Sequence, residues 1–183
     1  MRISGRGKAA LVAVTASALA VTAAGAVVGT TAAAGGGYGA PNLDHIYVIM
    51  LENHSKSSVI GDPNAPYMTN LAHTYSMADH YYGVTHPSMP NYIASIAGDN
   101  FGIQDDNDQN VVNLDRRNLV DQLEAAHVSW NAYMEDLPNN KLDRFWPSDT
   151  NPLYAKKHNP FVLFDDVKNS PARMSHVKKY SAL

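Results

Sequence analysis

The sequence predicts an α/β fold in which a mostly parallel β-sheet is flanked by helices. Residues 45–51 (HIYVIML) form a nearly unbroken apolar and β-branched run, which is typical of a strand buried on both faces, as in a parallel sheet. Residues 118–127 carry apolar side chains at helical spacing, and residues 129–134 favour a further strand. A buried strand, an amphipathic helix and a second strand are together consistent with α/β organisation.

The first 34 residues have the features of a secretory signal peptide. Residues 1–8 are basic, residues 9–29 are rich in Ala and Val, and residues 31–34 are small enough for a signal-peptidase site. The alternative is a membrane anchor, because the run is nearly long enough to span a bilayer. Its Ala, Thr, Ser and Gly residues insert weakly, however, so we expect cleavage near Ala34, secretion, and no stable membrane insertion afterwards. Residues 35–41 are then a flexible mature N-terminus.

Charge and cysteine content narrow the class of protein. Without Arg2, Arg6 and Lys8, the 14 basic residues fall to 11 against 17 acidic ones, a formal charge of −6. This balance argues against a nucleic-acid partner that is bound by neutralising its backbone. The chain has no cysteine, so any metal site must use His, Asp, Glu or Asn. The remaining length, on the order of 150 residues, is enough for one domain with a core.

Several further segments have local signals for structure. Residues 61–64 are a turn by composition, and residues 65–73 favour a helix that begins near Pro66. Residues 77–82 favour a short strand, and residues 99–108 form an acidic stretch. We interpret this stretch as a solvated surface loop rather than a calcium loop, because Gly and Glu are not at the positions that a calcium loop needs.

One serine lies where an extended segment turns into a helix, within residues 82–92 (YGVTHPSMPNY). Pro87 biases His86 towards extended geometry, and Pro90 suits the first turn of a helix. Ser88 is therefore expected near a helix N-terminus, where the positive end of the helix dipole favours a phosphate or a developing alkoxide. The alternative is that Ser88 is only an N-cap, a common role for serine.

Polar residues follow the first predicted strand at the edge of the sheet where α/β proteins bind ligands. Glu52 and Asn53 offer a carboxylate and an amide oxygen, and His54 lies next to them. Such donors can ligate a hard divalent cation. The alternative is that Glu52 and Asn53 are ordinary polar residues that end a strand.

The second half of the chain contains two more candidate features. Asp136 belongs to an acidic pair that follows the predicted strand at residues 129–134. Residues 156–158 (KKH) form a basic patch with a histidine, which could hold an anionic substrate or be part of a solvated loop. A final helix is expected to begin at Pro171, with Ser170 as its cap.

Five of these stretches, taken in order, resemble a known family. Residues 48–55 (VIMLENHS), 65–67 (APY) and 85–92 (THPSMPNY) resemble the bacterial phosphoesterase family, which holds secreted acid phosphatases and phospholipase C enzymes within the alkaline-phosphatase-like superfamily. Residues 133–138 (YMEDLP) and 157–161 (KHNPF) are similar to two signatures of its secreted acid phosphatase branch. The resemblance implies an alkaline-phosphatase-like α/β fold.

The resemblance also implies roles for individual residues and a divalent metal ion as cofactor. Ser88 would be the catalytic nucleophile, and Glu52 and Asn53 would hold part of the metal site. The remaining implied residues would lie at the substrate: Asn91, which would hydrogen-bond a phosphoryl oxygen, and His158, Asp136 and His86.

The function implied is that of a secreted, metal-dependent phosphomonoesterase that works through a phosphoserine intermediate. Its partner would be a phosphate-ester small molecule or a phospholipid head group. A phospholipase C or phosphodiesterase of the same family is one alternative, and a truncated, non-catalytic fragment is an alternative of another class. No G-x-S-x-G motif surrounds Ser88, which disfavours an esterase triad.

Members of the resembled family continue further and carry an acidic metal-binding cluster in their second half. Nothing after Phe164 matches this cluster. We therefore expect residues 42–183 to be the N-terminal part of a phosphoesterase domain, with a sheet that is incomplete at the C-terminus and with some metal ligands missing.

Overall fold

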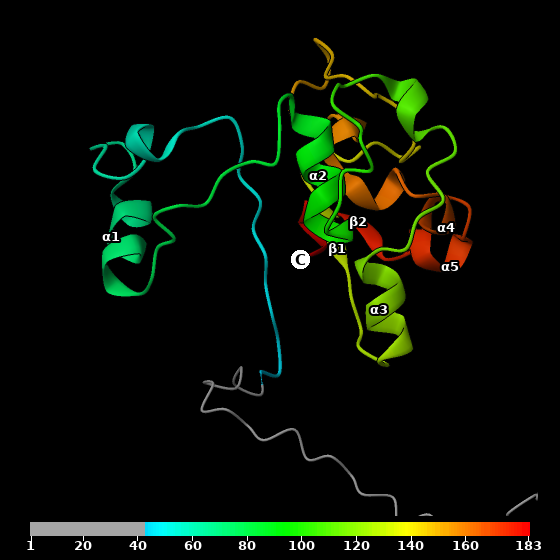
Figure 1. Ribbon diagram of the computed structural model, residues 1–183, viewed down its shortest axis with the longest axis horizontal. Helices are drawn as coiled ribbons and strands as arrows, with labels where there is room; N and C mark the ends of the chain where they lie inside the picture. Colours follow the sequence, from blue (N-terminus) through cyan, green and yellow to red (C-terminus); the bar gives the residue numbers. More distant parts are fainter. Residues whose placement is uncertain (1–42) are drawn as a thin grey trace, which may run out of the picture. The chain divides into compact units, whose positions relative to one another are not determined.

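The computed structural model describes residues 43–183, so the predicted signal peptide (1–34) and the predicted flexible segment (35–41) lie outside the described residues. The described residues fall into two units, residues 43–54 and residues 55–183, each of which is treated by itself below (Figure 1). Between residues 43 and 183, no helix is long and apolar enough to cross a membrane.

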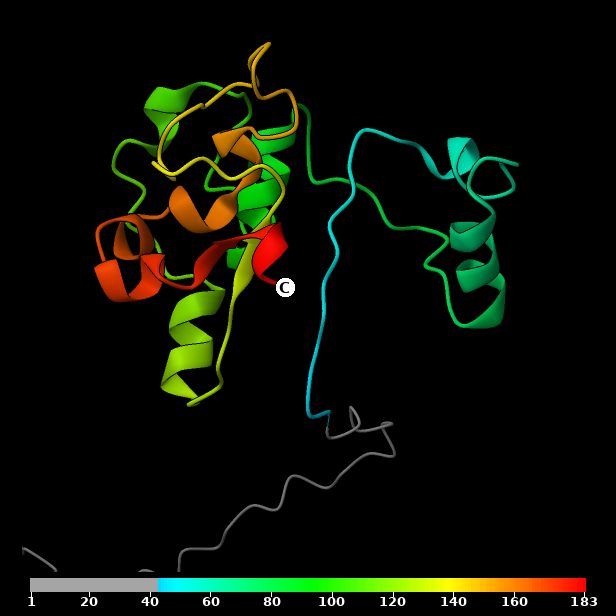
Figure 2. The ribbon, with the colours of Figure 1, turned by 180° about the vertical axis from the view of Figure 1, so that it is seen from behind.

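The central helix of the second unit is α2 (Ser88–Ala97). Its residues Met89, Ile93 and Ile96 recur at helical spacing and are buried together. The helix packs against the 3₁₀ turns η3 (Lys156–His158) and η4 (Pro160–Val162), which follow it much later in the sequence. Figures 1 and 2 show α2 in green beside these turns in orange. Gly98 ends the helix in the left-handed conformation, with φ 73°.

The other elements are short. The remaining helices are α1 (Pro66–Thr74), α3 (Leu119–Ala125), α4 (Asp165–Lys168) and α5 (Pro171–Met174). The remaining 3₁₀ turns are η1 (Lys56–Ser58), η2 (Asp108–Val111) and η5 (Tyr180–Ala182). Strands β1 (Ala132–Met134) and β2 (Val177–Lys179) pair in parallel, with Ala132 opposite Val177. Helices and a parallel strand pair together make an α/β arrangement, as predicted.

The core is built mainly from α2, α3 and the segment around Phe164. The side chains of Met89, Ile93, Val120 and Phe164 have no exposed surface. Trp130, just before β1, stacks on Phe161 with ring centroids 5.6 Å apart. Burial of aromatic and aliphatic side chains of this size is the main stabilising contribution to such a unit.

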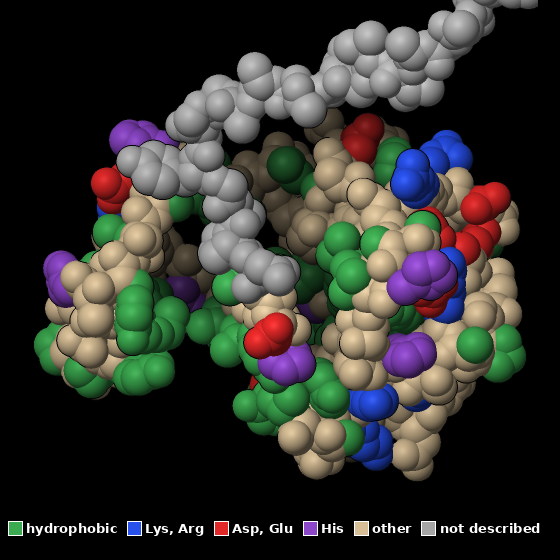
Figure 3. All heavy atoms as spheres, turned by 90° about the horizontal axis from the view of Figure 1, so that it is seen from below, with side chains coloured by type: hydrophobic (Ala, Val, Ile, Leu, Met, Phe, Trp, Pro, Cys, Tyr) green, Lys and Arg blue, Asp and Glu red, His purple; other side chains and the backbone are tan. Residues whose placement is uncertain are grey.

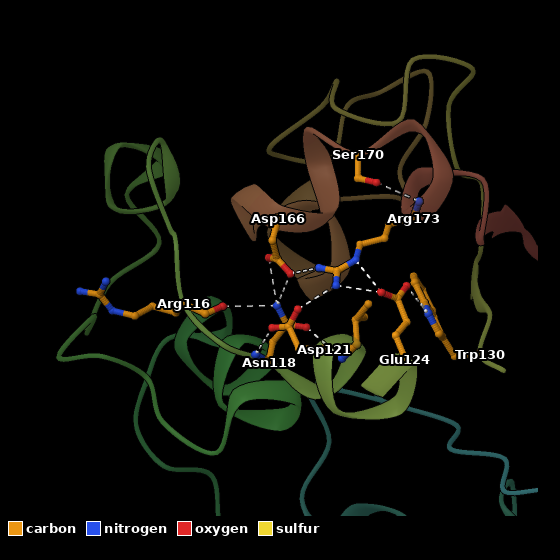
Figure 4. A network of polar contacts seen from close by, with 9 residues as sticks. Arg116, Asn118, Asp121, Glu124, Trp130, Asp166, Ser170 and Arg173 are labelled. Atoms are coloured by element: carbon orange, nitrogen blue, oxygen red, sulfur yellow. Dashed lines mark hydrogen bonds and ion pairs between the residues drawn. The ribbon is translucent and has the colours of Figure 1, made fainter. Parts of the chain in front are cut away.

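A network of charged side chains joins α3 to α4 and α5 (Figure 4). The Arg173 guanidinium donates to Asp121 at 2.8 Å, to Glu124 at 3.0 Å and to Asp166. Burial raises the pKa of Asp166. At Asp121 the same effect is outweighed by hydrogen bonds from the backbone of Asn118 and from Arg173, so the pKa of Asp121 lies below its ordinary value.

Four predicted helices are confirmed. The segment at residues 65–73 forms α1, the run after Pro87 forms α2, residues 118–127 contain α3, and α5 begins at Pro171. Ser170 caps α5 by accepting from the Arg173 N–H. The strand predicted at residues 129–134 is present as β1, shortened to its last three residues.

The strand predicted at residues 45–51 is wrong for the described structure. This segment forms no strand there, and its side chains are exposed, 76% for Ile46 and 83% for Ile49. A strand that is apolar on both faces needs neighbouring strands for its backbone and other elements to cover its faces. Within residues 43–183 the only sheet is the β1–β2 pair, and residues 45–51 take no part in it.

The strand predicted at residues 77–82 is also wrong, since this segment forms no strand and Tyr81 is 86% exposed. Apolar side chains accordingly reach the surface among charged ones, as Figure 3 shows for one face. Apolar spacing alone therefore overestimates strand content in a chain whose described sheet has two short strands.

The capping box of α3 provides a test of how this unit is held together. Asn118 is fully buried, accepts from the Val120 N–H at 2.9 Å and donates to Asp166 at 3.0 Å. We expect Asn118→Ala to lower the free energy of unfolding by about 1–3 kcal/mol, because it removes the cap and the hydrogen bond from Asn118 to Asp166, which keeps only its bond from Arg173. Urea denaturation followed by circular dichroism measures this change.

Asn118→Ser is the matched control, because a serine hydroxyl can still cap the helix but cannot reach Asp166 in the same way. The free energy of unfolding of Asn118→Ser should lie between those of the wild type and Asn118→Ala. Equal stability of all three proteins, within about 0.5 kcal/mol, would contradict the role of this residue.

Candidate active site

Ser88 is the first residue of α2, and its hydroxyl bonds to a distant histidine. Ser88 Oγ lies 2.8 Å from Nε2 of His158, a residue 70 positions further along the chain. Pro87 occupies the N-cap position, and no side chain caps the helix there. The Ser88 side chain therefore does not cap α2, and the N-cap alternative is wrong. A serine hydroxyl hydrogen-bonded to an imidazole is the usual arrangement for an activated oxygen nucleophile.

The segment that carries His158 is held from several sides. The Tyr92 ring stacks on the His158 ring at 4.9 Å between centroids and 20° between planes. Tyr92 is four residues after Ser88, so the two side chains share one face of α2. The backbone N–H of His158 donates to Ala155 O at 2.9 Å, which closes η3. These contacts fix where the imidazole lies relative to Ser88.

The residue after His158 is also buried. Asn159 has no exposed surface and donates to the Tyr154 hydroxyl at 3.2 Å. Tyr154 OH in turn donates to Lys141 O at 3.2 Å, and burial raises the pKa of Tyr154 to about 12. The phenol thus stays protonated and keeps donating, which anchors the chain on both sides of η3.

A third side chain, Asp106, links the neighbours of the Ser88–His158 pair. Asp106 Oδ1 accepts from the Met89 N–H at 2.9 Å, and Asp106 Oδ2 accepts from Lys157 Nζ at 2.5 Å. Burial alone would raise the pKa of Asp106. The hydrogen bonds from Lys157 and Met89 and the charges of Lys157 and His158 outweigh burial, so the pKa of Asp106 lies below its ordinary value.

The basic patch predicted at residues 156–158 is divided by the fold. The Lys157 side chain is 10% exposed, is paired with Asp106 and lies 4.0 Å from the centroid of the Trp146 ring. Its ammonium is therefore buried and already paired. The interpretation of all three residues as one solvated or anion-binding patch is wrong for Lys157. His158 is the member of the patch that contacts Ser88.

The loop before α2 is held by Asn91. Its Oδ1 accepts from the Val84 N–H at 2.8 Å, and its Nδ2 donates to Thr85 O and Pro87 O at 2.8 and 2.9 Å. The His86–Pro87 peptide bond in this loop is cis, and His86 is exposed. The amide of Asn91 thus shapes the approach to Ser88, while the contacts of Asn91 and His86 with a substrate stay predictions.

The first turn of α2 offers fewer free donors than its position suggests. The Met89 N–H is taken by Asp106, and Pro90 has no N–H. An anion near Ser88 would therefore depend on the helix dipole and on side chains more than on a cluster of backbone N–H groups.

The predicted metal ligands lie in the first unit and are considered there alone. Glu52 and Asn53 are exposed, Asn53 has φ 63°, and Glu52 O lies 3.2 Å from His54 Nδ1. Their oxygen atoms suit a hard divalent cation in kind. No group of three or more His, Asp or Glu side chains that could hold a metal occurs within residues 43–183. The role of Glu52 and Asn53 as metal ligands stays a prediction.

Asp136 lies just beyond the end of β1, where the sequence predicts an acidic pair. It is exposed with φ 48°, and its carbonyl oxygen accepts from Asn151 Nδ2 at 2.9 Å. This bond ties the end of β1 to the loop before η3. The role of the Asp136 carboxylate at a substrate stays a prediction.

Sequence reasoning missed Asp106 and Tyr92. Asp106 is one acidic residue among several in residues 99–108, and nothing in the local sequence distinguishes the carboxylate that turns inward. Its side chain is 8% exposed, which corrects the interpretation of this stretch as wholly solvated. Tyr92 could have been found, because its spacing of four residues from Ser88 places both on one helix face.

Comparison with known proteins matches the chain to one protein family and to several relatives. The Phosphoesterase family matches residues 61–182. The chain is 33% identical over 141 residues to "Probable acid phosphatase" of Kluyveromyces lactis, a match that covers 73% of this chain and 32% of the relative. It is 32% identical over 143 residues to "Acid phosphatase" of Aspergillus fumigatus, covering 76% of this chain and 31% of the relative.

A bacterial relative is similar to the same degree. The chain is 33% identical over 127 residues to "Phosphatidylinositol-3-phosphatase" of Mycobacterium tuberculosis, covering 69% of this chain and 41% of the relative. The chain spans about a third of the length of the acid phosphatases that it matches. No solved structure matches it.

Gly83 provides a test of the loop before α2. A Cβ at this position would lie 2.9 Å from Asn91 Oδ1, closer than carbon and oxygen atoms pack. We expect Gly83→Ala to displace the Asn91 amide and to lower the free energy of unfolding by about 1–3 kcal/mol. Urea denaturation of Gly83→Ala, of Asn91→Ala and of the double variant measures the coupling energy between the two positions. A Gly83→Ala effect of the same size in the Asn91→Ala background would contradict this explanation.

The Asp106–Lys157 pair predicts a specific loss of stability in acid. Since the pKa of Asp106 is lowered by folding, the unfolded chain takes up this proton first as the pH falls. The contribution of Asp106 is therefore complete above its ordinary value of 3.8 and is lost as the pH falls through the lower folded value. Between pH 3.8 and the lower folded value, Asp106→Asn should therefore have a flatter dependence of unfolding free energy on pH than the wild type. Parallel curves for the two proteins would contradict the prediction.

Proposed function

Because the chain belongs to the phosphoesterase family, we propose that it hydrolyses phosphate monoesters as an enzyme of acid phosphatase type, with Ser88 as nucleophile. The observation that carries the proposal is the 2.8 Å contact between Ser88 Oγ and His158 Nε2. The fold would be that of the alkaline-phosphatase-like superfamily. Similarity to two acid phosphatases supports the substrate class.

In the first half of the reaction, Ser88 Oγ attacks the phosphorus atom of the ester. An Oγ–P bond forms as the bond from phosphorus to the ester oxygen breaks, and the alcohol leaves. With its Nδ1 protonated, the neutral His158 imidazole takes the Ser88 proton on Nε2 and passes it to the departing alcohol oxygen. The positive end of the α2 dipole favours the negative charge that gathers at this point.

In the second half, water attacks the phosphoserine. His158 takes a proton from the water, the Oγ–P bond breaks, and the proton returns to Ser88 Oγ as inorganic phosphate leaves. The stack of Tyr92 on His158 limits rotation of the imidazole, so that Nε2 stays directed at the serine through both halves.

A divalent cation is part of the proposal. Glu52 and Asn53 would supply two of its oxygen ligands, and the bound cation would withdraw charge from the phosphoryl oxygens. Asn91, His86 and Asp136 complete the proposed substrate contacts. Secretion by way of the segment at residues 1–34 would place the enzyme outside the cell, where its substrate is a soluble phosphate ester or a phospholipid head group.

Replacement of the proposed nucleophile tests the function. Ser88→Ala should lower kcat for p-nitrophenyl phosphate by more than about 1,000-fold, because no other hydroxyl replaces the attacking oxygen. His158→Gln should lower kcat by about 100-fold to 10,000-fold, the usual contribution of a general base. Both assays are run with and without added divalent cations, and mass spectrometry after an acid quench locates the phosphate on Ser88.

Ser95→Ala is the matched control, since Ser95 is an exposed serine of the same helix whose Oγ donates to Tyr92 O at 2.6 Å. It should keep near wild-type turnover. Full activity of Ser88→Ala, or no hydrolysis by the folded wild-type chain, would overturn the proposal. A panel of phosphate monoesters and diesters, with phosphatidylinositol phosphates included, separates a phosphomonoesterase from a phospholipase C or phosphodiesterase.

A further inference from the structure

We propose that Asp106 is a positioning residue that holds Ser88 and His158 at hydrogen-bond distance. The proposal rests on the function proposed above, since it assigns Asp106 to the same reaction. The hydrogen-bond partners of Asp106 are sequence neighbours of Ser88 and His158. The two hydrogen bonds of the carboxylate go to Met89, which directly follows Ser88, and to Lys157, which directly precedes His158.

The carboxylate connects two segments that lie far apart in the sequence. Asp106 is 17 residues from Met89 and 51 residues from Lys157. Each oxygen atom serves one segment, Oδ1 the start of α2 at 2.9 Å and Oδ2 the η3 turn at 2.5 Å. A shift of either segment would lengthen one of these bonds, so the carboxylate opposes any separation of Ser88 from His158.

Burial makes this link stiff. The side chains of Asp106 and Lys157 are 8% and 10% exposed, so water competes little for either. The Lys157 ammonium also lies 4.0 Å from the centroid of the Trp146 ring, which holds it from a further side. A buried charge that loses its partner is strongly disfavoured, and the pair therefore has a narrow range of geometries.

Helix capping alone does not explain this arrangement. A cap requires only the bond between Asp106 Oδ1 and the Met89 N–H at the start of α2. The second bond, to Lys157, adds nothing to the helix and instead fixes the turn that presents His158. The two bonds together set the distance between the proposed nucleophile and its base. Misplacement of reacting groups by about 1 Å lowers rates by as much as about 100-fold.

The test measures the Ser88–His158 contact directly in the full chain, with or without turnover. Long-range ¹H–¹⁵N spectra of the histidine rings report the hydrogen bond at Nε2, with the signal of His158 assigned from His158→Gln. Ser88→Ala gives the chemical shift of the ring without its partner. We expect Asp106→Ala to move the His158 signal most of the way to that value, and to lower kcat for p-nitrophenyl phosphate by about 10-fold to 100-fold, with KM changed less than about 3-fold.

A second pair of variants separates positioning from general loss of folding. Lys157→Met should weaken the Ser88–His158 contact as Asp106→Ala does. Lys157→Arg should restore both the chemical shift and most of kcat, because a guanidinium can bond the carboxylate and stack on Trp146.

The Lys168–Asp165 ion pair is the matched control. It has the same 2.5 Å separation and side chains that are 16% and 20% exposed, but it joins residues within α4. Asp165→Asn should leave the His158 chemical shift and kcat unchanged, whatever it does to the melting temperature.

Failure of this inference and failure of the proposed function would give different results. An unchanged His158 signal in Asp106→Ala, or equal losses of kcat in Asp106→Ala and Asp165→Asn, would overturn the inference. A displaced signal in Asp106→Ala but not in Asp165→Asn supports it. If the folded wild-type chain hydrolyses no phosphate ester, the proposed function fails, and the chemical shifts still decide whether Asp106 positions the two side chains.

Discussion

The packing of α2 against the segment at residues 156–164 is the contact on which the described core and the candidate site both depend. Met89, Ile93 and Ile96 form the buried face of α2, and Leu163 and Phe164 lie in the same cluster. Because α2 begins at Ser88 and the facing segment contains His158, the contact that stabilises the core also joins these two side chains. Formation of the proposed site is thus coupled to folding of the unit.

Directional contacts of polar and aromatic side chains define interatomic distances that apolar packing sets only approximately. Apolar contacts are not directional, so they bring α2 and η3 together without fixing the distance between two atoms. The hydrogen bonds of Asp106 and the stack of Tyr92 on His158 are directional and supply that definition. Desolvation offsets much of the attraction within a buried ion pair such as Asp106–Lys157, so the pair defines geometry in addition to the stability that it contributes.

The β structure is sparse by comparison. Strands β1 and β2 have three residues each, and the loop-rich segment between them carries η3, η4, α4 and α5. The long apolar run at residues 45–51 has the composition of a central strand but is exposed in the described structure. The composition of a segment indicates its propensity for a strand, whereas the strand forms only when neighbouring strands are present to pair with it.

The sequence by itself determined the features that depend on near neighbours and on ordered motifs. Proline residues marked where α1, α2 and α5 begin, and apolar spacing marked α3, because these signals act within one or two helical turns. The motifs around Ser88 indicated the family and the start of a helix at the serine. Only the tertiary structure decided which histidine meets Ser88, which carboxylate turns inward and which lysine is buried. Those partners lie 17 to 70 residues apart, and their meeting depends on how the whole unit packs.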